Sequence, residues 1–195
     1  MFEVKSNPQL NKDSFIFAEN APYPYFTRTC LNNGIAGYVE YLDEEHKIKG
    51  NSIAVGMLGM QFFYMEKDFY AGQFTKTIYP KFDTFNSKIA HFFITWLNKF
   101  QKTFQGVLVR DFEKTFSESV ICLPTQNNKI AFDFMESYIQ ELEEERIQEL
   151  EAYLLVAGLK DINLTREENQ ALQTFAKLGD STLSGGGGSR ILFAA

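Results

Sequence analysis

The sequence has few of the side chains that most often bind metals or act as nucleophiles. Its 195 residues include two histidines and two cysteines, and Cys30 and Cys122 lie too far apart to form a Cys-x-x-Cys pair. So few ligands do not make a convincing zinc site, and unpaired cysteines are typical of a reducing compartment. We therefore expect no metal and a cytoplasmic location.

Long hydrophobic runs are also absent. No apolar run approaches the ~18 residues of a membrane-spanning helix, and the first residues, Met1-Phe2-Glu3-Val4-Lys5, lack the features of a signal peptide. Apolar residues nevertheless make up 45% of the chain and include 20 Phe, enough for a packed core. The length allows one domain, or one domain with an appendage, and we expect no membrane partner.

The formal charge of −6 by itself argues against a DNA-binding protein. The distribution of the charged residues along the chain changes that interpretation. Residues 1–129 carry 14 basic and 13 acidic side chains, net +1, whereas residues 130–195 carry 5 and 12, net −7. Within 70–129, eight basic residues stand against four acidic ones. The acidity therefore belongs to the C-terminal third, and it does not exclude DNA binding by the rest.

Short strands separated by polar turns are expected over residues 1–82. The turn signal is strongest at Asn32-Asn33-Gly34, where the backbone can adopt positive φ. Apolar residues then recur with helical spacing over 86–101, and Asn86 or Thr84 can cap that helix. The expected strands are 15–17, 38–41, 52–55, 60–64, 107–109 and 119–124.

A long helix is expected from Ile130 to about Leu155, with Gly158 as its end, and would be about 38 Å long. A capping box at residues 165–168 predicts a second helix and hence a helical hairpin. The Gly/Ser stretch that follows is a natural tail, a frameshifted end or an engineered linker. The sequence thus predicts an α+β recognition domain over 1–129, a helical spacer over 130–180 and a flexible tail over 181–195.

Enzyme motifs are weak. Asn20-Ala21-Pro22-Tyr23 departs from the Asn-Pro-Pro-Tyr loop of amino-methyltransferases at its second position, and no glycine-rich cofactor strand precedes it. Glu45-His46-Lys47 lies in a polar run typical of a solvated turn, and Gly56-Met57-Leu58-Gly59 lacks the ending of a phosphate loop. We therefore expect no catalytic residue and no cofactor, while a small stand-alone nuclease or methyltransferase fragment stays the alternative.

Polar side chains around the expected strands are more informative. Residues 25–34 and 69–81 are rich in Arg, Lys, Gln, Asn, Thr and Tyr, the side chains that contact base edges and phosphates in DNA complexes. Ordinary hydrophilic loops would have a similar composition, so composition alone leaves both interpretations open.

Three segments, 24–29, 32–39 and 50–56, resemble target recognition domains of DNA specificity subunits. These subunits belong to type I restriction–modification systems and related type II enzymes. The most specific part of the resemblance is Phe63-Tyr64 followed by Asp68-Phe69-Tyr70-Ala71-Gly72-Gln73. The Phe-rich helix over 86–101, the strand near 119–124 and the long helix after Ile130 follow in the family's order, and the resemblance covers roughly residues 2–178.

The resemblance implies an α+β recognition domain followed by a helix that spaces two such domains. A complete specificity subunit is similar to two of these units in tandem, each reading one half of a bipartite target. Its helices dock methylation subunits, and the restriction subunit joins the same assembly. With one recognition domain, this chain looks like a half-subunit or a truncated subunit.

Residue type together with this resemblance gives a candidate DNA-facing set. Gln73 and Tyr64 are the members most readily explained as supports of the core. The set is Arg28, Thr29, Asn32, Asn33, Tyr64, Gln73, Lys76, Thr77, Lys81 and Arg110.

The long helix carries an apolar stripe, and a helical hairpin alone would leave it exposed. A second copy related by a two-fold axis would cover it, which predicts a homodimer that reads an inverted repeat. The Glu-rich outer face of the helix would repel DNA. A decoy that occupies methylation subunits without reading DNA is a further alternative. The predicted interface residues are Phe134, Tyr138, Leu142, Leu150 and Leu154.

Overall fold

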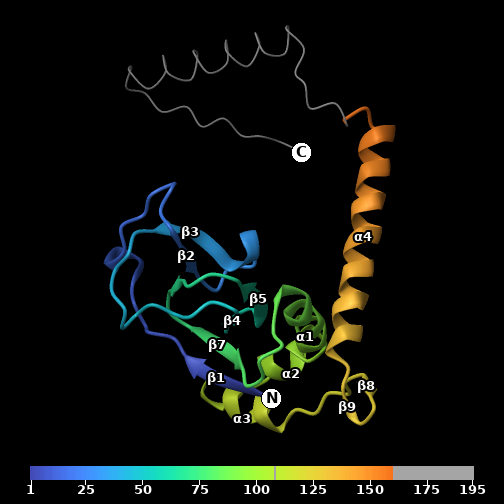
Figure 1. Cartoon of the computed structure of the whole chain (residues 1–195). Coiled ribbons are helices and arrows are strands. Elements are labelled where there is room, and N and C mark those ends of the chain that lie inside the picture. Colours follow the sequence, from blue (N-terminus) through green and yellow to red (C-terminus); the bar gives the residue numbers. More distant parts are fainter. Residues whose placement is uncertain (108, 160–195) are drawn as a thin grey trace, which may run out of the picture. The chain divides into compact units, whose positions relative to one another are not determined.

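The computed structural model describes residues 1–107 and 109–159. The chain divides into two units, Met1–Glu143 and Glu144–Ala195, which are described separately. The elements discussed below lie in the first unit, except that helix α4 continues into the second (Figure 1). Within the described residues no helix is long and apolar enough to cross a membrane.

A four-stranded antiparallel sheet, the larger sheet, forms the centre of the first unit. Its order is β1-β7-β4-β5, so β7 is a central strand. Ile78 of β7 is paired with Val4 on one side and Ile53 on the other, and both isoleucines are fully buried. The strands are β1 (Phe2–Ser6), β4 (Ser52–Gly56), β5 (Gln61–Met65) and β7 (Thr75–Pro80).

A three-stranded sheet, the smaller sheet, has the order β3-β2-β6. Strand β2 (Tyr23–Phe26) is antiparallel to β3 (Ile35–Val39) and parallel to β6 (Tyr70–Ala71). The parallel pairing sets Tyr25 opposite Tyr70. It therefore brings the segment after β2 close to the segment after β6, although the two are far apart in sequence.

The turn between β2 and β3 adopts the left-handed backbone expected from its sequence. In η2 (Leu31–Gly34), φ is 47° at Asn32, 52° at Asn33 and 80° at Gly34. A Cβ at Gly34 would lie 2.2 Å from the Phe26 ring, so this position also requires the absence of a side chain. Asn tolerates positive φ better than most residues, which explains this local choice of sequence.

Helices cover one face of the larger sheet. The predicted helix is confirmed as α1 (Ser87–Lys99), and the Asn86 side chain caps it by accepting a hydrogen bond from the Ile89 N–H at 3.1 Å. Its buried residues, including Phe93 and Leu97, pack with residues of the sheet and of the next helices. These are α2 (Gln101–Gln105), η3 (Val109–Asp111) and α3 (Phe112–Glu118).

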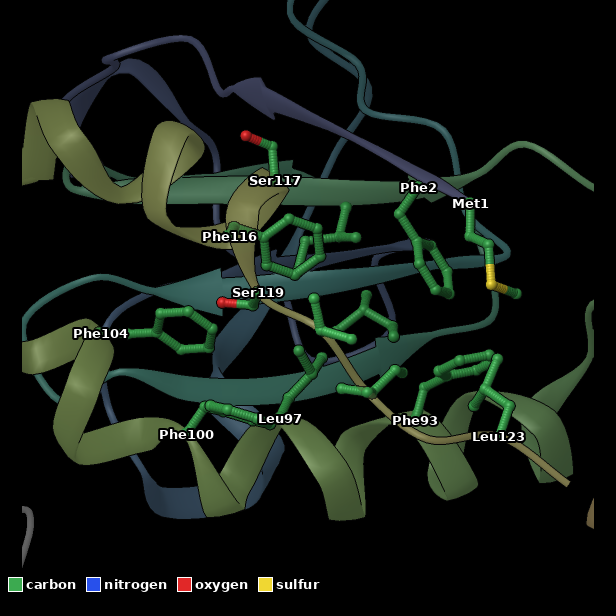
Figure 2. A pocket seen from close by; sticks show the side chains of 14 residues that line it. Met1, Phe2, Phe93, Leu97, Phe100, Phe104, Phe116, Ser117, Ser119 and Leu123 are labelled. Carbon is green, nitrogen blue, oxygen red and sulfur yellow. The ribbon is translucent and has the colours of Figure 1, made fainter.

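An apolar hollow of about 370 Å³, the core cavity, lies between the larger sheet and these helices (Figure 2). Phe2, Phe93 and Phe104 are among its lining residues, and the segment from Ser119 to Leu123 crosses it. The Ser119 hydroxyl at its margin donates to the Thr115 carbonyl at 2.7 Å. The hollow is therefore bordered by core residues on one side and by the exposed Met1 and Val120 on the other, with its polar margin satisfied by backbone.

The predicted long helix is confirmed as α4 (Phe132–Val156). In the first unit, Met135 and Ile139 are buried, and Lys88 of α1 donates to Gln140 at 2.8 Å. Gly158 has φ 70° and follows the helix end, as its sequence position predicts. The second helix and the Gly/Ser tail lie outside the described residues. The short elements are η1 (Lys12–Ser14), β8 (Thr125–Gln126) and β9 (Lys129–Ile130).

The α+β class and the strands near 52–55 and 60–64 are confirmed, and the strand expected at 38–41 lies slightly earlier, as β3. Three predicted strands are wrong. Residues 15–17 form one isolated bridge, Val107 lies at a bend and Val109 belongs to the 3-10 turn η3. Residues 119–124 pair with no strand among the residues that the structure describes. Their apolar residues, such as Ile121 and Leu123, pack against the core without joining a ladder. Burial alone therefore explains these apolar runs.

Candidate nucleic-acid interface

An open cavity of about 430 Å³, the polar cavity, lies beside the smaller sheet. It brings together three predicted DNA-facing residues, Arg28, Thr29 and Gln73. None of its lining side chains is a carboxylate, and two are cationic, so its lining is electropositive. The lining residues are Leu10, Asn11, Lys12, Tyr25, Thr27, Arg28, Thr29, Ala36, Gly72 and Gln73.

Arg28 stands exposed just after β2, with its guanidinium carbon 5.5 Å from the centroid of the Phe74 ring. The end of β4 passes close beneath it, since a Cβ at Gly56 would lie 3.0 Å from the Arg28 Cα. Phe74 is 43% exposed with φ 58°, a conformation that is strained for a bulky residue. Stacking on an aromatic ring orients a guanidinium without using its hydrogen-bond donors.

The loop that carries Phe74 is held by its backbone. The Phe74 N–H donates to Gln9 Oε1 at 3.1 Å, and its carbonyl accepts from the Met57 N–H at 3.0 Å. The neighbouring Gln73 donates from Nε2 to Asn11 Oδ1 at 2.8 Å. The loop after β6 is thereby tied to the N-terminal segment, which fixes the rim of the polar cavity.

The other predicted residues near the smaller sheet lie on its surface. The Thr29 hydroxyl accepts from the Leu31 N–H at 3.2 Å, and Asn32 Nδ2 donates to the Ile35 carbonyl at 3.2 Å. Asn32 and Asn33 are exposed at the left-handed turn. Arg28, Thr29, Asn32, Asn33 and Gln73 therefore all lie around the smaller sheet and reach solvent.

Tyr64 lies elsewhere, on β5 beneath α1. Its hydroxyl donates to Asn51 Oδ1 at 3.0 Å, and its ring meets Phe85 and His91 edge-on. Burial raises the pKa of the Tyr64 hydroxyl. These contacts are those of a structural support, one of the two roles that the sequence allowed for this residue.

Lys76 and Thr77 are buried, so the structure does not support the DNA contacts predicted for them. Lys76 Nζ donates to Ser6 Oγ at 2.7 Å and to Glu113 Oε1 at 2.6 Å. The Thr77 hydroxyl donates to Asn7 Oδ1 at 2.7 Å. Both residues belong to central strand β7, and their polar atoms are satisfied within the fold.

Lys81 and Arg110 are exposed but do not line the polar cavity. Lys81 follows the far end of β7, roughly 20 Å along the strand from Thr75 at ~3.3 Å per residue. Arg110 Nε lies 3.7 Å from Asp111 Oδ2 in η3. Any DNA contact that they make would lie outside the polar cavity.

Sequence reasoning missed Asn11, Lys12, Tyr25 and Phe74 as site residues. Lys12 Nζ lies 5.0 Å from the centroid of the Phe17 ring at the edge of the polar cavity. Asn11 and Lys12 stand in a polar run that resembles any surface turn. Tyr25 and Phe74 lie inside the segments that drew attention, but an aromatic residue there indicates a core position as readily as a site.

Three predicted interface residues on α4 form an exposed apolar surface. Phe134, Tyr138 and Leu142 are 56%, 45% and 37% exposed, and they line a groove of about 330 Å³ with Phe92 and Trp96 of α1. We call it the α1/α4 groove. Leu150 and Leu154 lie in the second unit, where Leu150 is exposed and Leu154 partly exposed.

Replacing Glu113 with Gln tests the assignment of Lys76 to the fold. The hydrogen bond from Lys76 lowers the pKa of Glu113 below 4.5. Its stabilising effect is therefore complete above that pH and is lost as the pH falls through the folded-state pKa. We expect Glu113→Gln to lower the free energy of unfolding by about 1–3 kcal/mol at neutral pH, with the difference shrinking in acid, as measured by urea unfolding.

Lys76→Met is the matched control for that experiment. This substitution removes the ion pair between Lys76 and Glu113 without leaving a buried cation unpaired. It should therefore lower the free energy of unfolding by less than Glu113→Gln does. It should also leave any DNA affinity unchanged, because Lys76 is buried. Weaker DNA binding by a stably folded Lys76→Met protein would restore this lysine to the DNA-facing set.

The family model of the type I restriction modification DNA specificity domain matches residues 1–152. The chain therefore belongs to this family, a non-catalytic DNA-recognition component of restriction–modification systems. No curated protein matches the chain. Among residues 1–107 and 109–159, no three His, Cys, Asp or Glu side chains are grouped as a metal site would require.

Solved structures show the same fold at low sequence identity. An HsdS subunit from Thermoanaerobacter tengcongensis matches with 11% identity and a TM-score of 0.50, over 92% of this chain and 42% of that one. A chain from a study of complex assembly and conformational transition in the type I R-M system matches with 12% identity and a TM-score of 0.51, over 93% and 42%.

The S subunit of a type I system from M. genitalium matches with 17% identity and a TM-score of 0.46, over 80% of this chain and 40% of that one. This chain thus spans about two fifths of the length of each solved relative.

Proposed function

We propose that this chain recognises one half of a bipartite DNA target through the surface around the polar cavity. The observation that carries the proposal is the gathering of Arg28, Thr29, Gln73 and Lys12 at one cavity without a carboxylate. Asn32 and Asn33 extend this surface along the turn after β2. Lys81 and Arg110 are candidates for phosphate contacts farther away, and the cytoplasm is the expected location.

Arg28 is the candidate for reading a base. Its stacked guanidinium presents a planar fork of donors, which matches the O6 and N7 acceptors of guanine in the major groove. Such a contact discriminates one base pair, whereas a phosphate contact acts alike on all sequences.

The experiment is to select preferred duplexes from a random pool with the unaltered protein and to repeat the measurement with Arg28→Ala. We expect a loss of ~1–3 kcal/mol on the preferred sequence, with preference relaxed at one position. Arg146→Ala is the control, since it removes the same charge from an exposed residue on α4. Unchanged affinity and preference in Arg28→Ala would contradict the assignment.

We also propose that the helical region, residues 130–180, joins two copies of the chain and docks methylation subunits, to which the restriction subunit is added. The exposed α1/α4 groove supports this, because an apolar surface of this kind is typical of an interaction site. Two copies would together approach the length of one solved relative. A two-fold dimer would present two recognition domains, those of residues 1–129, to an inverted repeat.

Two other functions stay testable alternatives. A stand-alone enzyme would cleave DNA with magnesium or methylate it with S-adenosylmethionine. We expect the purified chain to catalyse neither reaction. A decoy would bind methylation subunits through its helices without binding any duplex. Binding of methylation subunits with no measurable DNA affinity would favour the decoy over the recognition subunit.

A further inference from the structure

Tyr25 has a hydroxyl group without a partner at the polar cavity. The residue is 3% exposed, and its ring packs against Phe15 and Phe17 with centroid distances of 4.9 and 5.2 Å. A Cβ at Gly72 would lie 2.7 Å from the Tyr25 hydroxyl oxygen, so the glycine leaves the space beside it open. Within residues 1–107 and 109–159 this hydroxyl forms no hydrogen bond. Since no fully buried polar side-chain atom of those residues lacks a partner, the hydroxyl oxygen is accessible from the polar cavity.

Tyr70, the neighbour of Tyr25 across the parallel pairing of β2 and β6, has the opposite arrangement. Its hydroxyl donates to the Asp43 carbonyl at 2.9 Å and accepts from the N–H groups of Leu42 and Asp43 at 3.0 and 3.2 Å. The fold thus satisfies one of two adjacent tyrosines and leaves the other directed at a cavity.

The chemistry of the lining identifies the partner as an anion. Lys12 and Arg28 are cations, the hydroxyls of Thr27 and Thr29 are nearby, and no lining residue is acidic. Lys, Arg, Thr and Tyr are the side chains that proteins use to hold DNA phosphates. Burial raises the pKa of Tyr25, so its hydroxyl keeps its proton and can act as a donor.

We propose that the polar cavity receives one phosphate group of the DNA backbone, and that Tyr25 donates its innermost hydrogen bond. This inference rests on the proposed function and assigns phosphate contact and base contact to different residues. Tyr25 and Lys12 fix the position of the recognition domain on the duplex, while Arg28, at the rim over Phe74, reads a base.

Tyr25→Phe removes the hydroxyl and nothing else. Using the full chain and a labelled duplex of mixed sequence, we expect roughly tenfold weaker binding on every sequence, since a hydrogen bond to a charged group is lost. The thermal midpoint should not fall, because the hydroxyl has no partner in the fold. Tyr70→Phe is the matched control, and it should lower the thermal midpoint without changing DNA affinity.

Duplexes with single methylphosphonate substitutions provide the second measurement. Neutralising the phosphate that occupies the cavity should weaken binding of the unaltered protein but have little further effect on Tyr25→Phe. Lys12→Ala should weaken all sequences alike and reduce the slope of log affinity against log salt by about 1.

The outcomes separate this inference from the proposed function. If Tyr25→Phe binds DNA like the unaltered protein while Arg28→Ala binds more weakly, the phosphate site is overturned. The proposed DNA recognition would be unaffected by that result. A fall in thermal midpoint for Tyr25→Phe would also overturn it, because the hydroxyl would then have a partner within the fold. Failure of the unaltered protein to bind any duplex would overturn both.

Discussion

Replacing Tyr138 and Leu142 together with Glu should convert the proposed dimer into monomers and weaken binding to an inverted-repeat duplex by ~100-fold or more. Both side chains line the α1/α4 groove beside Phe92 and Trp96, so each new carboxylate would have to be desolvated when a second copy covers the groove. Affinity for a duplex with one half-site should stay unchanged, because the polar cavity is formed by other elements.

Sedimentation measures the first effect and anisotropy titration with the two duplexes measures the second. Ser137→Glu combined with Gln148→Glu is the matched control, since it adds the same charge at exposed positions of α4 that do not line the groove. A dimer that persists in Tyr138→Glu/Leu142→Glu would show that another surface holds the copies together. A monomeric unaltered protein would contradict the homodimer itself.

The elements that depend on local sequence could be predicted. Helix α1 has apolar residues at helical spacing and an Asn that caps its first turn, and both signals lie within about four turns. The turn at Asn32-Asn33-Gly34 was equally local, because these residue types tolerate positive φ. The Glu-rich helix α4 followed from its length and its apolar spacing.

Strand β7 could not be predicted in the same way, because its polar residues depend on partners far along the chain. Lys76 is paired with Ser6 and Glu113, and Thr77 with Asn7. Nothing near Lys76 or Thr77 in sequence indicates these partners. From the sequence alone, each of these polar side chains therefore resembled an exposed group. In the structure each is buried, and its polar atoms are hydrogen-bonded within the fold.

For the same reason, some residues of the candidate site could be predicted from the sequence and others could not. Arg28, Thr29 and Gln73 could be named from residue type and from the resemblance, and the polar cavity brings them together. Lys12 and Tyr25 could not, because the parallel pairing of β2 with β6 and the N-terminal segment beside them create the cavity. That pairing joins segments separated by more than forty residues and leaves no periodic signal in either.

Phe104→Ala should be among the most destabilising single substitutions in the chain. Phe104 of α2 is fully buried, with ring centroids of Phe62, Phe112 and Phe116 at 6.1, 5.3 and 6.2 Å. It also lines the core cavity, so truncation enlarges an existing void instead of opening one that neighbours can fill (Figure 2).

We expect the free energy of unfolding to fall by ~3–5 kcal/mol, measured by chemical denaturation. Leu58→Ala is the control, because that apolar side chain is 59% exposed and its loss should cost less than ~0.5 kcal/mol. Equal effects of the two substitutions would contradict the burial of Phe104 between the larger sheet and the helices. A large effect of Phe104→Ala alone would confirm that this aromatic cluster, none of whose residues lines the polar cavity, stabilises the first unit.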